Sequence, residues 1–576
     1  MANSQEYRLA QEKNFFLSCV KKNPVFLLQH VKSLAGVVLA RCKVKFLTKL
    51  RGQHRGNKMT PGWLRSLRLA NHSQCADLPQ LLQNIPLFEI KNNAIIAADL
   101  AWQNEITDPE YYLAQQRWGI LTDELLTSTT SSLLPDAVTQ QILQTLNDQA
   151  ATLETYSTCE RIANLVNWLA FMPRQQRLAG VPPDTLKFLE KSLQWVLKHL
   201  EFYGQRTGNH ILNNARSLIL AGVVLQNKFA VATGKLIFQK MLPVLIQPNG
   251  FLRERSSHYQ LIVLGWLLDA FAYLQATEFY PAIELKFLAD YIDSMRSAAG
   301  ELCDQQGNLQ VLIGDISPDL SPIKTTQRLS KCHSAFWPVK VVSTGLRDDW
   351  CILHSAQSKV ILNCPAGRYP KLFSSHAHND ITSFVWLYHG EPILTDCGRA
   401  RYTKDPVSTL QKSAYGHNLP LVNGFAPLSE SLVINGNWWP TPYASAQVDI
   451  SSDAAHRVAI THNGFKRATP VKQHQRQIVV DDHQLWIEDF FNGHGLIDLE
   501  LRWQLPPGFV VVEKNKLFTN GSVMLEIDLR GMQNLPVLSE QRGWASTQYG
   551  VAVANPVIAM QWQVPLPFTT VLIFKV

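Results

Sequence analysis

Along roughly the first 325 residues, apolar side chains recur at the spacing of amphipathic helices. Residues 186–202 read LKFLEKSLQWVLKHLEF, in which an apolar residue returns every third or fourth position. Residues 209–222 repeat this spacing, whereas residues 259–274 are apolar nearly all round, as in a helix buried on every side. Gly, Pro and Asn separate these helix-length segments. We therefore expect helices that stack in pairs into a solenoid or a ring.

After about residue 340, the pattern shortens to the alternation of β-strands. Asp481, Asp482 and His483 lie between two such runs like a hairpin turn. Strands that follow one another without helix-length segments predict an antiparallel sandwich. The stretch 316–338 contains three prolines and is the predicted linker. The predicted strands cover residues 360–363, 383–388, 456–461, 478–480, 485–490, 497–505 and 523–529.

The two patterns together predict an α+β chain with two main domains. We expect the helical domain at residues 81–325 and the antiparallel β-sandwich at residues 340–576. Residues 1–80 are expected to form a basic N-terminal arm that is partly helical. The composition agrees, because 46% apolar and 17% charged residues over 576 positions exclude a disordered or collagen-like chain.

The net charge of +8 belongs to this arm. Between Lys13 and Ala76 there are thirteen Lys or Arg and no Asp or Glu, so the remainder holds 41 basic against 46 acidic residues. A basic arm favours an anionic neighbour, which could be nucleic acid, a phospholipid surface or an acidic glycan, although a solvated face is the alternative. Because the arm contains no aromatic-interleaved recognition motif, we expect no nucleic-acid partner but a peripheral contact with a membrane.

The cysteines and the apolar runs indicate a compartment. Nine cysteines, widely spaced and without a Cys-x-x-Cys pair, form neither a disulfide framework nor a zinc-finger pattern, and they suit a reducing environment. We recognise no signal peptide, and no window reaches the about 18 apolar residues that a membrane span needs. A cytoplasmic location, or one at the periphery of the inner membrane, is therefore expected.

Two polar clusters stand at predicted helix starts. Gly208, Asn209 and His210 open one helix, where backbone donors attract anions and the Asn209 amide could donate to a carboxylate. A simple N-cap is the alternative interpretation of Asn209. His258 and Tyr259 open the other helix, where nearby arginines could lower the phenol pKa and allow proton exchange. The alternative is an amphipathic tyrosine whose ring lies in the core.

A third cluster flanks the strand predicted at residues 383–388. His376 and His378 precede it and would face the same side of a strand. Asp396 and His417 follow it. Two histidines and one carboxylate are normal zinc ligands. Hydrogen-bonded polar residues at the rim of a sheet are the alternative.

Taken together, these clusters resemble the heparinase II/III-like polysaccharide lyases. The resemblance spans residues 156–424, and the order and separation of its motifs make it specific. That family has an (α/α) toroid followed by an antiparallel β-sandwich, so the resemblance implies an incomplete toroid for the helical half. In chain order, the matching segments read YSTCERIANLVNWLAF, RTGNHILNNARSLILAG, NGFLRERSSHYQLIVLGWLLDAF, SSHAHNDITSFVWLYHGEPILTDCG and YGHNLPLVNG.

The resemblance implies β-elimination at a uronic acid within an acidic polysaccharide, which leaves an unsaturated uronate end. Negative charge that develops on the uronate carboxylate must be neutralised, a base must take the C5 proton, and an acid must protonate the leaving oxygen. By resemblance, Asn209 neutralises the carboxylate and Tyr259 acts as the acid and often also as the base. His376 falls on a histidine that assists neutralisation or serves as the base.

Other positions are expected to support these three. His378, Asp396 and His417 fall where some family members hold a structural zinc ion. At Asn213 the sequence departs from the family, which often has Glu there. For the arginines among the residues beside the motifs, an ordinary surface position is the alternative to a substrate contact. The residues from which we expect substrate contacts are His210, Arg255, His258, Arg399 and Tyr402.

A non-catalytic function remains as the alternative. A glycan-binding or assembly protein of capsule or exopolysaccharide biosynthesis would keep the cleft of the toroid without cleaving the glycan. The absence of a recognised export signal and the basic arm motivate it, since family members without a signal resemble those of bacterial capsule or exopolysaccharide gene clusters.

Overall fold

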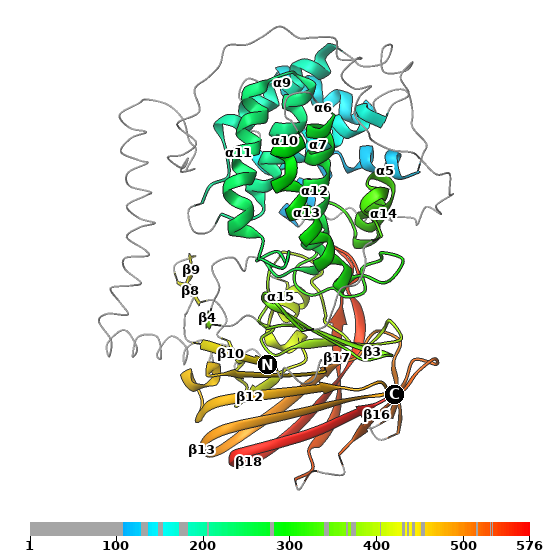
Figure 1. Ribbon diagram of the computed structural model, residues 1–576. Helices are drawn as coiled ribbons and strands as arrows, with labels where there is room; N and C mark the ends of the chain where they lie inside the picture. Colours follow the sequence, from blue (N-terminus) through cyan, green and yellow to red (C-terminus); the bar gives the residue numbers. More distant parts are fainter. Residues whose placement is uncertain are drawn as a thin grey trace, which may run out of the picture.

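The computed structural model describes residues 108–576 with internal gaps, and these residues form a helical half followed by a half made of antiparallel sheets (Figure 1). The predicted basic arm at residues 1–80 lies outside the described residues, as does the first part of the predicted helical domain. The gaps are residues 128–135, 148–153, 172–182, 204–206, 277–281, 339–344, 365–366, 370–375, 404, 429–431, 435–436, 440–443, 451–455, 514–516, 530–531 and 533.

The helices of the first half follow one another along the chain, and a long stretch, residues 303–321, separates the last two of them. Among the described residues, no helix combines the length and the apolar character needed to cross a membrane. The helices are α4 (Pro109–Gln115), α5 (Gly119–Thr127), α6 (Asp136–Asn147), α7 (Thr155–Phe171), α9 (Pro183–Lys198), α10 (His210–Val224), α11 (Lys228–Leu245), α12 (Ser257–Gln275), α13 (Ala282–Leu302) and α14 (Pro322–Cys332).

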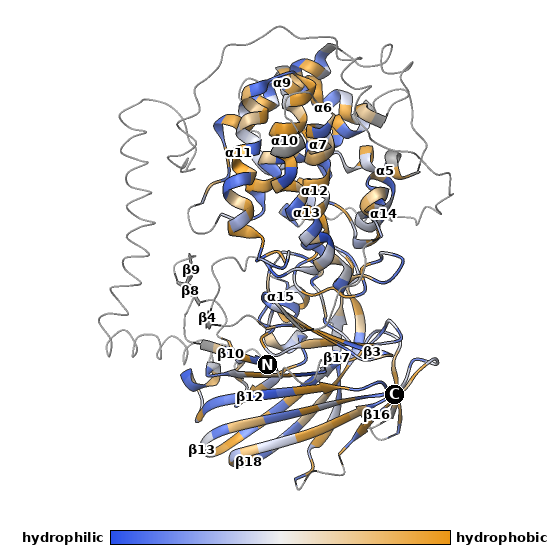
Figure 2. Cartoon of the chain, viewed as in Figure 1, coloured by the Kyte–Doolittle hydropathy of each residue, from blue (hydrophilic) through white to orange (hydrophobic). Residues whose placement is uncertain are grey.

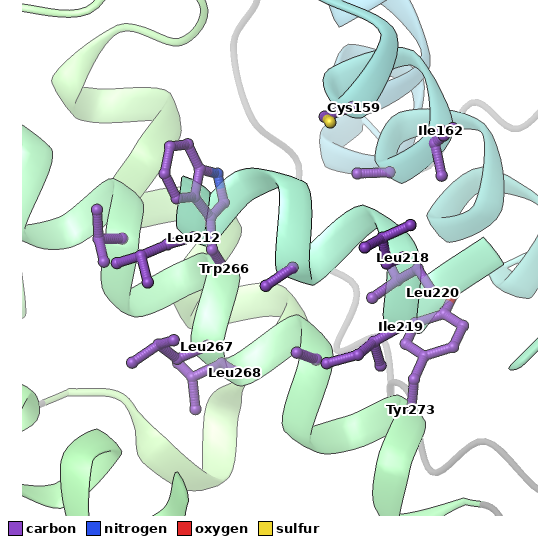
Figure 3. Close-up of a cluster of buried hydrophobic side chains, with 14 of the residues drawn as sticks. Cys159, Ile162, Leu212, Leu218, Ile219, Leu220, Trp266, Leu267, Leu268 and Tyr273 are labelled. Carbon is purple, nitrogen blue, oxygen red and sulfur yellow. The ribbon is translucent and has the colours of Figure 1, made fainter. Parts of the chain in front are cut away.

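Helix α10 lies at the centre of this half, because it contacts α7, α9, α11 and α12. Figure 3 shows apolar side chains of α7, α10 and α12 in one cluster, among them Ile162, Leu218 and Trp266, and all three are buried. A Cβ atom at Gly234 of α11 would lie 2.6 Å from the carbonyl oxygen of Ala215, so glycine there lets α11 approach α10 closely. The burial of these faces accounts for the helical apolar spacing.

The second half contains two antiparallel sheets. A five-stranded sheet has the order β1-β2-β3-β5-β6, and an eleven-stranded sheet runs β14-β15-β16-β18-β13-β12-β11-β10-β4, with β17 on β18 and β7 on β13. The strands of the five-stranded sheet are β1 (Gly345–Arg347), β2 (Trp350–His354), β3 (Ser358–Asn363), β5 (Phe384–Tyr388) and β6 (Glu391–Leu394). Those of the larger sheet are β4 (Gly367–Tyr369), β7 (Pro420–Val422), β10 (Ala444–Ile450), β11 (Arg457–His462), β12 (Val471–Val480), β13 (Gln484–Gln504), β14 (Val510–Glu513), β15 (Leu517–Thr519), β16 (Met524–Asp528), β17 (Val537–Ala545) and β18 (Val553–Lys575). A separate hairpin joins β8 (Leu432–Ile434) to β9 (Asn437–Trp439).

The two sheets pack face to face around one apolar core. Leu353 of β2 and Trp386 of β5 belong to the same buried cluster as Ile478 of β12, Ile487 of β13 and Leu572 of β18. Alternate residues of β12 are buried, and Figure 2 shows the corresponding change of hydropathy along the long strands. The predicted antiparallel β-sandwich is therefore present.

The structure also differs from the sequence-based expectations in three places. Helix α14 occupies the middle of the stretch predicted as the linker, where Ser321 caps its start by accepting a hydrogen bond from the backbone of Lys324. Strand β13 is one strand where two were predicted, because a register shift between Phe491 and Gly495 interrupts the alternation without ending the pairing. Residues 376–383 form a loop before β5, so the expectation that two histidines share one face of a strand there is wrong.

Candidate active site

The predicted catalytic residues meet where the two halves adjoin. Asn209 stands at the start of α10, Tyr259 lies in the first turn of α12, and His376 lies in the loop before β5. The short helix α15 (Pro406–Lys412) lies between the two halves in Figure 1, close to this junction. Asn209 and Tyr259 lie on two helices that contact each other, and the docking of the helical half on the sheets adds His376 to them.

Asn209 is not the simple N-cap of α10. Its backbone is already helical, with φ −58° and ψ −27°, and its side chain makes no capping hydrogen bond. Instead, the backbone N–H of Asn209 donates to Oε1 of Glu254 at 2.8 Å, so a carboxylate from another segment stabilises the helix start. The buried Asn209 amide is thereby left to face His376, with its Nδ2 atom 3.5 Å from Nε2 of the imidazole.

His376 and Tyr259 lie against one another. Their rings stack with centroids 3.8 Å apart and planes 9° apart. The Tyr259 hydroxyl lies 2.9 Å from the Tyr402 hydroxyl, which itself donates to the carbonyl oxygen of Ile316 at 3.0 Å. Tyr259 is therefore the donor to Tyr402. Burial and the nearby Asp319 carboxylate raise the pKa of Tyr259, so its phenol is protonated at neutral pH.

Asp315 is the acidic centre of the site. This buried carboxylate lies 3.2 Å from Nδ1 of His376, 3.0 Å from Nε2 of His378 and 3.0 Å from Nη1 of Arg399. Burial by itself would raise the pKa of Asp315. The positive charge of Lys412 and the two histidine hydrogen bonds outweigh it, so this pKa is held well below its usual range. Asp315 is ionised at neutral pH and can only accept hydrogen bonds.

Glu254 is a second buried acid beside the histidine. Its Oε2 atom lies 3.5 Å from Nε2 of His376 and has no hydrogen-bond partner among the described residues. Sequence reasoning assigned a role to neither Glu254 nor Asp315. Glu254 lies in a matching motif next to several more prominent residues, and Asp315 immediately precedes the predicted linker. The only local signal for Asp315 is Gly314, whose φ of +80° indicates a tight backbone approach.

Three of the predicted substrate-binding residues lie at this site. Tyr402 contacts the Tyr259 hydroxyl, and the guanidinium of Arg399 lies 5.0 Å above the Tyr402 ring. His210 has a side chain that is 45% exposed, and its Nδ1 atom lies 3.2 Å from Oε1 of Glu201. Of the three, His210 is the most accessible to a ligand from solvent.

The other two predicted substrate-binding residues, Arg255 and His258, are buried within the protein. His258 accepts a hydrogen bond at Nδ1 from the backbone of Ser317 and contacts Oγ1 of Thr325 through Nε2 at 2.9 Å, which leaves neither nitrogen free for a ligand. Arg255 has φ +55° and is 3% exposed. The geometry gives no support to substrate contacts by either residue.

The three predicted zinc ligands come together. Ligand atoms of His378, Asp396 and His417 all lie within 4.8 Å of one another, and the three residues are buried. His378 directs Nε2 at Asp315, and His417 directs Nδ1 at Oδ2 of Asp396 at 2.8 Å. The remaining nitrogens, Nδ1 of His378 and Nε2 of His417, are buried without a hydrogen-bond partner among the described residues. Neutral imidazoles that donate one N–H to a carboxylate and keep the other nitrogen free are what zinc sites use, so these residues fit the ion.

Comparison with known proteins agrees with this architecture. Residues 348–557 match the family model described as heparinase II/III-like, C-terminal, and this match confirms the resemblance drawn from the sequence motifs. Among solved structures, heparinase III aligns with a TM-score of 0.58 and 12% identity over 98% of this chain and 91% of that one. A mutant of the heparan sulfate lyase HepC from Pedobacter heparinus aligns with a TM-score of 0.53 and 14% identity over 90% and 86% of the two chains. At these identities the structural matches show the shared fold. No curated protein sequence matches the chain.

Proposed function

Because the C-terminal part of this chain belongs to the heparinase II/III-like family, whose members include polysaccharide lyases, we propose that the protein cleaves a uronic-acid-containing acidic polysaccharide by β-elimination. The observation that carries the proposal is the meeting of Asn209, Tyr259 and His376 from three separate motifs. In this interpretation the helical half is an incomplete (α/α) toroid, and the glycan lies across its junction with the sandwich.

Asn209 neutralises the uronate carboxylate in the proposed mechanism. As the C5 proton leaves, negative charge spreads onto this carboxylate, and a donor placed there stabilises the transition state more than the ground state. The Asn209 side chain has no capping role in α10, so its amide is available as that donor. His210, which follows it and is exposed to solvent, contributes a contact to the same sugar or to its neighbour.

Tyr259 and His376 divide the proton transfers. Tyr259 holds its proton at neutral pH because of its burial, so it acts as the acid that protonates the leaving O4 oxygen. His376 acts as the base, because its Nδ1–H is donated to Asp315 and its Nε2 therefore carries the lone pair. The C5–H bond breaks with the proton passing to Nε2, the C4–C5 double bond forms, and the C4–O4 bond breaks.

A zinc ion held by His378, Asp396 and His417 is part of the proposal. When bound, the ion supplies positive charge and a rigid link between the loops that follow β6 and α15, without contact with the substrate. His378 also shares Asp315 with His376, so the orientation of the metal ligand and that of the base are connected through one carboxylate.

We propose an acidic polysaccharide as the partner of the site and a membrane surface as the partner of the basic arm. The substrate is an acidic polysaccharide, and the named relatives are a heparan sulfate lyase and heparinase III. Residues 1–80 lie outside the described residues, so their contact with a membrane rests on the sequence alone.

The test is to incubate the protein with a panel of uronic-acid polysaccharides and to follow the ultraviolet absorbance of the unsaturated product. Tyr259→Phe should abolish activity while leaving the fold intact. Tyr273→Phe is the matched control, because Tyr273 is a buried tyrosine of the same helix whose hydroxyl donates to the Val166 carbonyl, away from His376. Activity that survives in Tyr259→Phe would refute the mechanism. Glycan binding without unsaturated product, unchanged in Tyr259→Phe, would instead favour the non-catalytic alternative.

A further inference from the structure

The stretch between α13 and α14 connects the catalytic parts of the two halves. Its backbone is held from the helical side, where Oγ of Ser256 donates to the carbonyl oxygen of Asp315 at 2.7 Å and the N–H of Ser257 donates to that of Ile313 at 3.0 Å. It is held from the sheet side by the N–H of Asp315, which donates to the carbonyl oxygen of His376 at 2.9 Å. The stretch therefore lies directly between the start of α12 and the His376 loop.

Gly314 makes this close approach feasible. A Cβ atom at this position would lie 2.7 Å from the carbonyl oxygen of Arg255 and 2.8 Å from that of His376, and its φ of +80° disfavours any other residue. The backbone is consequently fixed where the Asp315 side chain begins. Asp315 forms two hydrogen bonds with His376, one through its backbone N–H and one through its carboxylate.

The two oxygens of Asp315 have different partners. Oδ1 accepts from Nε2 of His378 and from Nη1 of Arg399, each at 3.0 Å, and Oδ2 accepts from Nδ1 of His376 at 3.2 Å. An ionised carboxylate offers only acceptors, so the nitrogen that faces it on each imidazole must carry the hydrogen. Neutral His376 has one N–H, and Nδ1 uses it in the hydrogen bond to Asp315, whereas Oε2 of Glu254 lies 3.5 Å from Nε2 and accepts no hydrogen bond from a described residue. The lone pair is then on Nε2, which lies 3.5 Å from Nδ2 of Asn209.

We propose that Asp315 is a positioning residue that holds His376 with Nε2 as the proton acceptor facing the sugar. This role rests on the proposed lyase function, since it specifies how the base of that reaction is oriented. Asp315 belongs to the helical half and His376 to the sheet half, so the contact also sets the position of the base relative to Tyr259 and Asn209.

The Asp315→Asn substitution tests this role at constant shape. If the amide oxygen keeps the two donors now on Oδ1, the amide NH₂ faces Nδ1 of His376. A donor there requires Nδ1 to accept, so the hydrogen of His376 moves to Nε2 and removes the lone pair from the cleft. We expect kcat to fall by about 10- to 100-fold, the range typical of losing such a partner. KM should change by less than about twofold, because the groups that bind the uronate remain.

Asp269→Asn is the matched control. Like Asp315, Asp269 is a buried carboxylate that accepts hydrogen bonds from histidine and arginine side chains, in this case from His333, Arg216 and Arg328. It contacts none of the proposed catalytic residues. Removing its charge should lower the melting temperature without lowering kcat. A general effect of losing a buried carboxylate would lower kcat in both variants, and that result would overturn the positioning role.

A second measurement separates this inference from the proposed function. Selective ¹⁵N labelling of histidine reports which ring nitrogen carries the hydrogen, and His376→Gln identifies the signal of His376. The wild type should show the hydrogen on Nδ1, and Asp315→Asn should show it on Nε2. An unchanged His376 signal in Asp315→Asn, or a wild type with the hydrogen on Nε2, would overturn the inference. If no polysaccharide yields an unsaturated product, the lyase function fails, while the ¹⁵N spectra still decide the role of Asp315.

Discussion

His258 should make the protein less stable as the pH falls from 7 to 5. Its imidazole is 1% exposed, and burial lowers its pKa to about 3 in the folded state. The backbone N–H of Ser317 points at Nδ1, so a proton added there would meet a donor instead of an acceptor. An exposed histidine has a pKa of about 6.5. Between these two values the unfolded chain binds the proton and the folded chain does not, so stability is greatest above about pH 6.5 and is lost as the pH falls.

The size of this loss follows from the two pKa values. At pH 5 the unfolded state is stabilised by proton binding by about 2 kcal/mol, and at pH 7 by only about 0.2 kcal/mol. Because the folded-state pKa of His258 is well below 5, the folded protein gains almost nothing at either pH. The expected loss between pH 7 and pH 5 is therefore about 2 kcal/mol, a substantial part of the typical 5 to 15 kcal/mol of a folded protein.

His258→Gln isolates this contribution. Glutamine keeps a donor toward Thr325 but does not titrate, so the variant should lose about 2 kcal/mol less than the wild type between pH 7 and pH 5. Other buried histidines contribute equally to both proteins and cancel in the difference. Urea unfolding, followed by the helical signal in circular dichroism at each pH, measures the free energies. Equal losses in the two proteins would show that His258 accepts a proton in the folded state and would refute the reasoning.

Three further predictions concern the site and its support. Asn209→Ala should lower kcat by about 10²- to 10³-fold in the product-absorbance assay, because it removes a donor to the transition state. Its melting temperature in calorimetry should be unchanged, because the Asn209 side chain does not cap α10. A loss of stability with retained activity would contradict this prediction. Arg476→Met should destabilise the sandwich by about 3 to 5 kcal/mol in calorimetry, because the buried Asp489 carboxylate loses its guanidinium partner and keeps the hydrogen bond from His474. Adding Asp489→Leu should recover part of that loss. An Arg476→Met protein as stable as the wild type would show that the pair is not needed. Dialysis against a chelator should lower the melting temperature of protein loaded with zinc but not that of His417→Ala, and equal effects on both would exclude His417 as a ligand.

The apolar pattern predicts much of the fold because it reflects burial directly. The segment 259–274 is apolar nearly all round, and α12 is buried nearly all round between its neighbours. The pattern fails where a polar or glycine-rich interruption does not end an element. Around Gly495 the alternation of β13 stops, yet the strand continues to pair with β18 beyond it. The local sequence does not indicate which partner strand will pair with such a segment.

The site could be predicted only in part, for a related reason. Asn209, Tyr259 and His376 lie in motifs that resemble a known family, and the structure brings them together. Asp315 and Glu254 make their contacts with residues far away in the chain, and apart from Gly314 nothing in their neighbours distinguishes them from ordinary acidic residues. Their importance follows from burial and from the docking of two halves, neither of which the spacing of residues reveals.

The division of the site between the two halves has a consequence for how the protein fails. Tyr259 and Asn209 belong to the helices, His376 belongs to a loop of the sheets, and the stacked rings allow little separation before contact is lost. A small opening of the junction would therefore abolish the proposed lyase activity while every helix and strand remained folded. Heat or denaturant should abolish turnover before circular dichroism changes, and the interval between the two transitions would measure how firmly the halves are joined.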